Sequence, residues 1–171
     1  LITKTAELIL PGDTLDVLAY ACTSASIVLG TPAVAKNLNA AKPEAKTTNP
    51  AVAAFYAFHA LAAKRIAVLT PYAKHVNDMV QKSVEEAGFD VPVFGSFNEP
   101  HDPTVAAIDL KSLQTGIARI IEGQDVDAVF ISCTSVRIAI DVAAIETELG
   151  IPVTSSNHAL AWHCLRLAGI D

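Results

Sequence analysis

Short apolar runs alternate with longer amphipathic segments along most of the chain. Five runs rich in Val, Ile, Ala and Phe have the length and composition of buried parallel strands, at residues 15–21, 65–70, 92–97, 127–132 and 151–155. Helical patterns, each closing on a glycine suited to a left-handed C-cap, cover residues 75–88, 108–123 and 138–150. This alternation predicts an α/β fold with parallel sheets and helices on both faces.

The order of these elements predicts two pseudo-symmetric, flavodoxin-like lobes. Residues 62–154 hold a nearly complete second lobe, whereas residues 1–61 resemble the back half of a similar first lobe. The last helix, within 155–171, is expected to cross back and complete the first lobe. The first ten residues read as the end of a helix before a turn, so we expect the first lobe to lack its N-terminal strand in this chain. Residues 39–50 read as a flexible loop.

Composition limits the choice of partners. About half of the 171 residues are apolar, which can support a substantial core. The apolar runs are far shorter than the roughly 20 residues that span a bilayer, and no signal-peptide pattern stands at the start, so we expect a cytoplasmic protein without a membrane partner. The formal charge of −6, with acids and bases interspersed, offers no basic patch for nucleic acid.

A Cys-Thr-Ser sequence occurs twice in matching surroundings, in "LDVLAYACTSAS" and "VDAVFISCTSVR". Each cysteine, Cys22 or Cys133, stands six residues after an aspartate, at the end of a predicted strand and directly before an expected helix. Doubly wound sheets bind ligands at this edge. The hydroxyl and N–H groups that follow could hold a carboxylate, and they belong to Thr23, Ser24, Thr134 and Ser135.

The same surroundings favour a reactive thiol. A helix N-terminus lowers the pKa of a thiol below its ordinary value near 8.5, so one cysteine could act as base or nucleophile while its partner acts as acid. A single cysteine at a strand end is more often structural, but the matched pair favours chemistry. Cys164 lacks this context and is predicted to be a core residue. Three cysteines make a disulfide framework improbable.

Other chemistries find little support. The five histidines show no HExxH or close Cys/His pairing, so we expect no metal site. No Gly-rich phosphate loop or GxSxG elbow is present, which argues against NTPases, dinucleotide enzymes and serine hydrolases. Tyr72, at a strand end, is either a packing residue or a ligand donor. For Arg137 we favour a structural role.

Four motifs together resemble the aspartate/glutamate racemase superfamily, and within it the branch of maleate isomerases and ectoine-utilisation proteins. They are "YACTSAS", "VLTPY", "FISCTSVR" and "SSNHALAWHCLRLAG", and the resemblance covers essentially the whole chain. It implies two facing lobes, each offering one cysteine to a small carboxylate or dicarboxylate, without a metal or organic cofactor. We also expect a homo-oligomer.

The resemblance also implies roles for further residues. Tyr72 would bind a substrate carboxylate, and Asn157 would shape the site. An asparagine of the family corresponds either to Asn98 or to Asp102, and a carboxylate at Asp102 would repel a dianionic substrate. Related arylmalonate decarboxylases have glycine in place of Cys22, which disfavours decarboxylation.

The sequence therefore predicts a cofactor-independent isomerase that uses Cys22 and Cys133. The nearest activity is maleate cis–trans isomerisation, in which the Cys22 thiolate adds to the alkene and Cys133 manages the proton. One alternative is two-base racemisation of an amino acid of the Asp/Glu type. Another is a non-catalytic carboxylate-binding accessory protein of ectoine utilisation.

Overall fold

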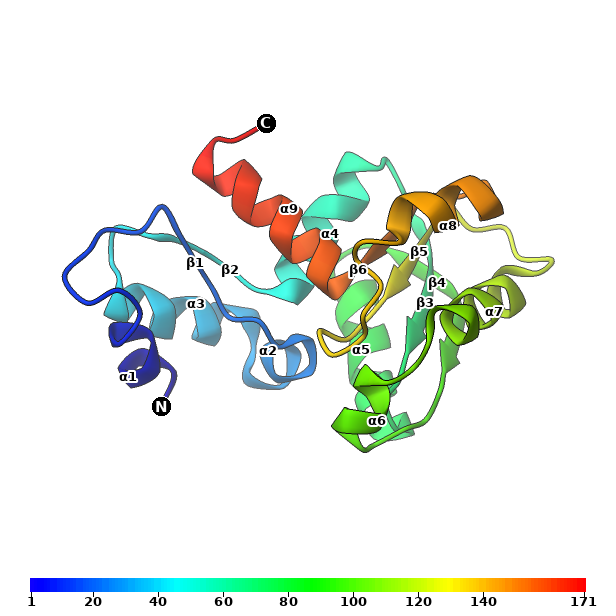
Figure 1. Ribbon diagram of the computed structural model, residues 1–171, viewed down its shortest axis with the longest axis horizontal. Coiled ribbons are helices and arrows are strands. Elements are labelled where there is room, and N and C mark those ends of the chain that lie inside the picture. The colour runs from blue at the N-terminus through cyan, green and yellow to red at the C-terminus, as the bar shows by residue number, and fades with distance from the viewer.

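Two separate parallel sheets organise the structure, a computed structural model that describes residues 1–171 (Figure 1). The larger sheet has the strand order β4-β3-β5-β6, with β3 at Arg65–Thr70, β4 at Asp90–Ser96, β5 at Ala128–Ile131 and β6 at Val153–Ser155. The smaller sheet pairs β1 (Val17–Ala19) with β2 (Lys46–Thr48). Every strand pair is parallel. The predicted α/β fold with parallel sheets is confirmed.

The central strands of the larger sheet bring two chain segments to the same edge. β5 is buried along its whole length, as is β3 after its first residue, because their apolar side chains are covered on both faces. Leu69 pairs with Ile131, so β3 and β5 end side by side. The residues that follow, Tyr72 and Cys133, therefore leave the sheet at neighbouring points.

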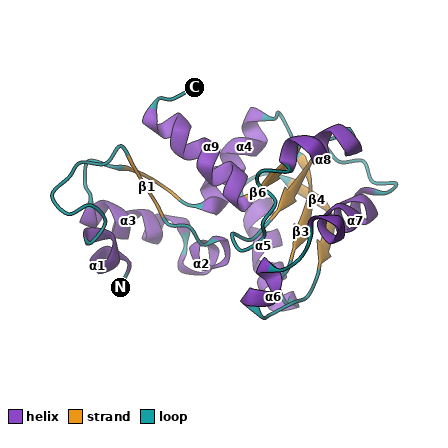
Figure 2. Cartoon of the chain, viewed as in Figure 1, coloured by secondary structure: helices purple, strands orange, loops and turns teal.

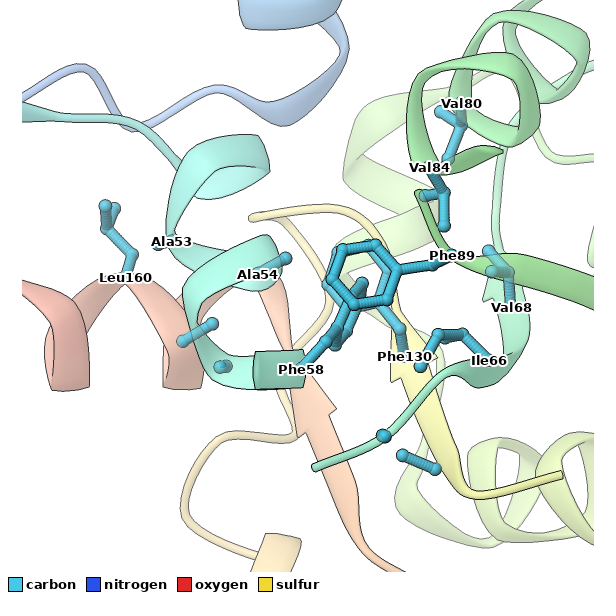
Figure 3. Close-up of a cluster of buried hydrophobic side chains, with 14 residues drawn as sticks. Ala53, Ala54, Phe58, Ile66, Val68, Val80, Val84, Phe89, Phe130 and Leu160 are labelled. Carbon is cyan, nitrogen blue, oxygen red and sulfur yellow. The ribbon is translucent and has the colours of Figure 1, made fainter. Parts of the chain in front are cut away.

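Helices cover both faces of this sheet (Figure 2). They are α4 (Pro50–Ala60), α5 (Lys74–Glu86), α7 (Leu110–Ile121), α8 (Val142–Leu149) and α9 (Ser156–Ala168), while the short α6 (Asp102–Ala106) lies beyond the carboxyl end of β4. On one face, Phe58 of α4 contacts Phe130 and Phe89 edge to face, at ring distances of 5.4 and 5.1 Å (Figure 3). Aromatic pairs of this geometry add to the hydrophobic gain of burial. None of the helices has the length and apolar character needed to traverse a bilayer.

The smaller sheet packs with α1 (Ile2–Glu7) and α3 (Thr31–Ala41) around a minor core, whereas α2 (Thr23–Leu29) packs against α3, α4 and α5. The last helix, α9, packs on α4 and also contacts β1 and β2 (Figure 1). Two polar contacts fasten it there: Lys46 donates to the Leu167 carbonyl at 2.7 Å, and Thr48 Oγ1 lies 2.8 Å from His163 Nδ1. The assignment of residues 1–61 and 155–171 to one lobe and 62–154 to the other stays a prediction.

Two sequence predictions are wrong in detail. The expected loop at 39–50 contains the end of α3, the strand β2 and the start of α4, where the Asn49 side chain caps the helix by accepting from two backbone N–H groups. The strand escaped the hydrophobic pattern because Lys46, Thr47 and Thr48 are polar. The helix expected from residue 138 begins only at Val142, so a loop and not a helix follows Cys133.

His163 should make stability depend on pH. Its side chain is 5% exposed and stacks on Tyr56 at a ring distance of 4.4 Å, and burial lowers its pKa. Because the unfolded chain binds the proton more readily, the free energy of unfolding should fall as pH drops through the ordinary histidine pKa of about 6.5. Urea unfolding between about pH 8 and about pH 5 should show a smaller loss in His163→Gln than in the unmodified protein. Equal losses in both proteins would contradict this role.

Candidate active site

The two Cys-Thr-Ser segments lie next to each other at the carboxyl ends of β1 and β5. Cys22 is the N-cap residue of α2 in an extended conformation and is half-buried, whereas Cys133 is 6% exposed. The Thr134 hydroxyl donates a hydrogen bond to the Ala21 carbonyl at 3.2 Å. The second segment therefore touches the residue that precedes Cys22, although the two are more than a hundred positions apart in sequence.

A buried serine joins the segments a second time. Ser156 Oγ accepts a hydrogen bond from Thr23 Oγ1 at 2.8 Å and another from the Cys133 backbone N–H at 3.1 Å. Ser156 is fully buried at the start of α9. Ser156 is not among the site residues predicted from the sequence. Its only signal was the "SSN" at the head of the last helix, where a serine is ordinarily read as a helix cap.

The two thiols have different surroundings. Cys22 stands at a helix start, as predicted, with Ser24 Oγ 3.9 Å from its Sγ. The prediction of a helix directly after Cys133 is wrong, because α8 begins only at Val142. Instead, the Ser135 backbone N–H points at Cys133 Sγ at 3.4 Å. At Cys133 one N–H contact to the sulfur thus stands where the first turn of a helix was expected.

Tyr72 lies close to both cysteines. Burial raises the pKa of its phenol far above the ordinary value, and the neighbouring Cys133 and Cys22 raise it further, whereas the Ser132 hydroxyl acts in the opposite direction. The phenol therefore stays protonated and can donate a hydrogen bond at any pH at which the protein works. The buried Ser132 hydroxyl makes no hydrogen bond of ordinary geometry, so its effect on Tyr72 is small.

A polar network fixes the turn that carries Tyr72. The Tyr72 carbonyl accepts hydrogen bonds from Asn77 Nδ2 at 2.8 Å and from Ser96 Oγ at 2.6 Å, and its N–H donates to Thr70 Oγ1 at 3.2 Å. Ser96 Oγ also accepts from the Asn98 N–H at 2.9 Å. Asn98 is exposed and adopts a left-handed conformation with φ of 51°. This backbone contact ties the loop that carries Asn98 to the Tyr72 turn.

Asp102 and Asn157 both contact the loop after β5. The Ser135 hydroxyl donates to Asp102 Oδ1 at 2.6 Å, which brings a carboxylate beside the second Cys-Thr-Ser segment. Asn157 Nδ2 donates to the Thr134 carbonyl at 2.8 Å and to the Val136 carbonyl at 3.3 Å. The Asn157 amide group thus holds this loop through two backbone carbonyls, and its role in the site stays a prediction.

A pocket of about 450 Å³ lies near this loop, between the start of α7 and residues 137–141. Asn157 and Arg137 line it, but neither cysteine does. This pocket is therefore separate from the two thiols. The structure also brings no three His, Cys, Asp or Glu side chains together in a group that could hold a metal ion.

Cys22 should react with alkylating agents before Cys164. Both side chains are half-buried, but burial raises the pKa of the Cys164 thiol, whereas Cys22 stands at a helix start. Limited iodoacetamide treatment near neutral pH, followed by peptide mass spectrometry, should find Cys22 labelled first. Cys133, at 6% exposure, should follow more slowly. Preferential labelling of Cys164 would contradict the assignment of a reactive thiol to Cys22.

The family model for arylmalonate decarboxylase matches residues 10–171. Among curated proteins, the chain is 29% identical over 164 residues to the maleate isomerase of Pseudomonas putida KT2440, covering 91% of this chain and 65% of the relative. It is 30% identical over 160 residues to the maleate isomerase of Nocardia farcinica, covering 88% and 63%. The chain thus spans slightly less than two thirds of the length of these relatives.

Solved structures agree in fold over nearly the whole chain. A Pseudomonas putida S16 maleate isomerase variant with maleate has a TM-score of 0.84 at 26% identity, covering 99% of this chain and 68% of that one. A Nocardia farcinica maleate isomerase variant with a covalently bound succinylcysteine intermediate has a TM-score of 0.82 at 26% identity, covering 91% and 66%. The resemblance found in the sequence motifs is therefore confirmed, and the chain belongs to the arylmalonate decarboxylase family.

Proposed function

We propose that the protein is a cofactor-independent isomerase of a small carboxylate or dicarboxylate that uses Cys22 and Cys133 as a pair. The observation that carries the proposal is the contact between the two Cys-Thr-Ser segments. The Thr134 hydroxyl donates a hydrogen bond to the Ala21 carbonyl, and Tyr72 lies beside both cysteines. The similarity to maleate isomerases, including one with a succinylcysteine intermediate, supports it. The presence of both cysteines favours isomerisation over decarboxylation.

The proposed reaction is maleate cis–trans isomerisation. The Cys22 thiolate forms a bond to one alkene carbon, and the π electrons move to the other carbon, which takes the proton of the Cys133 thiol. The former double bond is now single and rotates. Cys133 then removes a proton from the same carbon, the double bond forms again in the trans geometry, and the Cys22 thiolate leaves. Every bond and proton returns to its starting place, so no cofactor is required.

Some of the predicted binding residues already have partners. A hydroxyl has one hydrogen to donate, and those of Thr23 and Thr134 are directed at Ser156 and at the Ala21 carbonyl. The Asn157 amide hydrogens bond two backbone carbonyls. We therefore propose that these three residues hold the frame of the site. The predicted binding residue Ser135 also has its partners, because its hydroxyl donates to Asp102 and its N–H points at the Cys133 sulfur. The groups left to bind a substrate carboxylate are the Ser24 hydroxyl and the Tyr72 phenol, with the exposed Asn98 as a further donor.

The test is turnover of maleate by the intact protein, followed as fumarate by NMR. An isomerase should also form a succinyl adduct on Cys22, visible by mass spectrometry. Cys133→Ser should make that adduct accumulate, because water can still protonate the carbanion but no thiolate remains to remove a proton and release the product. Maleate that binds and is released unchanged, without an adduct, would reject the isomerase and favour a carboxylate-binding protein. A homo-oligomer stays a prediction.

Racemisation is the second candidate, and the position of Asp102 favours it. A carboxylate beside Ser135 would attract the ammonium group of an amino acid and repel the second carboxylate of maleate. Two thiols on opposite sides of Cα could then remove and deliver a proton. Deuterium incorporation from heavy water at Cα, in a panel of aspartate-like and glutamate-like enantiomers, would identify this reaction.

Removal of the Asp102 charge should strengthen maleate binding. The Asp102→Asn variant keeps an oxygen that can accept from Ser135, but it removes a negative charge next to the site. One charge at about 5 Å in water is worth roughly 1 kcal/mol, so the KM or inhibition constant of maleate should fall about fivefold, and less at high salt.

Asp125→Asn is the matched control for this change. Asp125 is exposed and pairs with Arg65 at the amino end of β3, away from the thiols. Its replacement should leave maleate binding unchanged. The same binding constant for Asp102→Asn and the unmodified protein would mean that Asp102 does not face the substrate.

A further inference from the structure

Ser156 links the surroundings of the two thiols through one atom. Its Oγ lies 2.8 Å from Thr23 Oγ1, in the residue after Cys22, and 3.1 Å from the backbone nitrogen of Cys133. Both contacts are buried, and Ser156 itself has no exposed surface. A displacement of this hydroxyl therefore changes the position of both cysteines at once.

Helix capping does not account for this hydroxyl. The N-cap of α9 is Ser155, whose side chain accepts from the His158 N–H at 3.2 Å. Ser156 is the next residue, within the first turn, and its Oγ is directed at other parts of the chain. Two adjacent buried serines thus divide the tasks, since Ser155 begins the helix and Ser156 bonds the two cysteine segments.

The other link between the segments is weaker. Thr134 Oγ1 reaches the Ala21 carbonyl at 3.2 Å in an exposed setting, where water competes for both groups. A hydrogen bond in a dry environment is electrostatically stronger, and an unpaired group there is costly. If the Ser156 hydroxyl is lost, the Thr134 contact alone should hold the segments together without fixing their separation.

We propose that Ser156 is a positioning residue that sets the separation and direction of the Cys22 and Cys133 thiols. It touches neither the thiols nor the substrate, and it acts through the Cys133 backbone and the Thr23 hydroxyl. Its kinetic consequence rests on the proposed isomerase function. The geometric part, the distance between two sulfur atoms, can be measured without any turnover.

The experiment measures thiol proximity and kinetics in Ser156→Ala. In a Cys164→Ser background only two thiols remain, so a short bifunctional thiol reagent reports whether Cys22 and Cys133 come together within one chain. The cross-linked fraction at a fixed time should fall several-fold. A misplacement of about 1 Å can cost on the order of 100-fold in rate, so kcat should fall about 10- to 100-fold while KM changes less than about threefold.

Val84→Ala is the control for stability. Val84 is 2% exposed in the large core, and it lies near the end of α5, where the Phe89 N–H donates to its carbonyl just before β4, at the opposite end of the strands from the cysteines. The change should lower stability by opening a small cavity and leave cross-linking and kcat unchanged. A loss of cross-linking in Val84→Ala equal to that in Ser156→Ala would assign the effect to general destabilisation and overturn the proposal.

Thr23→Val removes the other partner of the hydrogen bond with Ser156. It can replace Ser156→Ala in the experiment if that variant does not fold. Both substitutions break the same hydrogen bond, the one between Thr23 and Ser156. The double variant should therefore cross-link no worse than Ser156→Ala, so the effects should not add. Cross-linking at the unmodified rate in either single variant would overturn the proposal. If the unmodified protein turns over no substrate but its cross-linking still depends on Ser156, the proposed function fails and the positioning role stands.

Discussion

Cys22→Ser and Cys133→Ser should each lose about 10²- to 10⁴-fold of turnover and keep the fold. Serine is slightly smaller than cysteine and fits both sites, but its hydroxyl does not ionise near pH 7, so it can neither add to an alkene nor exchange a proton as a thiol does. Turnover of maleate and of amino-acid enantiomers gives the first quantity. Thermal unfolding of the same preparations gives the second.

Cys164→Ser is the control for these two variants and should keep full turnover. The sequence predicted a core residue at this position, but Cys164 is half-buried at the margin of the large core. Its replacement should therefore cost no more than about 1 kcal/mol of unfolding free energy. Near-normal rates in both Cys22→Ser and Cys133→Ser would reject the paired-thiol mechanism.

Tyr72→Phe should lower kcat/KM by about 100-fold, the effect of removing one well-placed donor to a developing negative charge. The ring packs against both large hydrophobic clusters, and phenylalanine keeps that packing, so the free energy of unfolding should change little. The loss should be the same across the working pH range, because the raised pKa keeps the phenol protonated throughout.

Tyr56→Phe provides the comparison. Tyr56 is 56% exposed on α4 and carries the same phenol away from the cysteines, so this variant should retain the normal kcat/KM. If Tyr72→Phe also retains it, the Tyr72 ring serves packing alone, and the substrate carboxylate must be bound by other donors, such as the Ser24 hydroxyl.

The parts of the fold that sequence predicted well are those with an apolar pattern. The strand at 65–70 appears with the same bounds because its four central residues, 66–69, are buried in the middle of a sheet and are all apolar. β2 gave no such signal, since Lys46 and Thr47 lie at a sheet edge and only Thr48 is buried there. The hydrophobic pattern of a sequence reports burial, so it does not reveal elements that lie at the margin of a core.

The same limit applies to the site. The repeated Cys-Thr-Ser was visible because repetition is a property of the sequence itself. The contacts of Ser156 with Thr23 and of Asp102 with Ser135 join residues that are 133 and 33 positions apart. Serines are common, and nothing local distinguishes one that bridges two segments from one that faces water. Only the packing of α9 and α6 against the strand ends selects these partners.

Because α9 runs from the cysteines to β2, turnover should depend on how firmly the far end of this helix is held. This helix begins next to the cysteine segments, with Ser156 and Asn157 in its first turn. It ends beside β2, where the Leu167 carbonyl accepts a hydrogen bond from Lys46. Partial detachment of its far end weakens the cooperative unit to which its first turn belongs. A substitution of Lys46 can thus reduce turnover by populating a state in which α9 is partly detached. Activity lost in this way reflects lost structure, because the chemical steps themselves are unchanged.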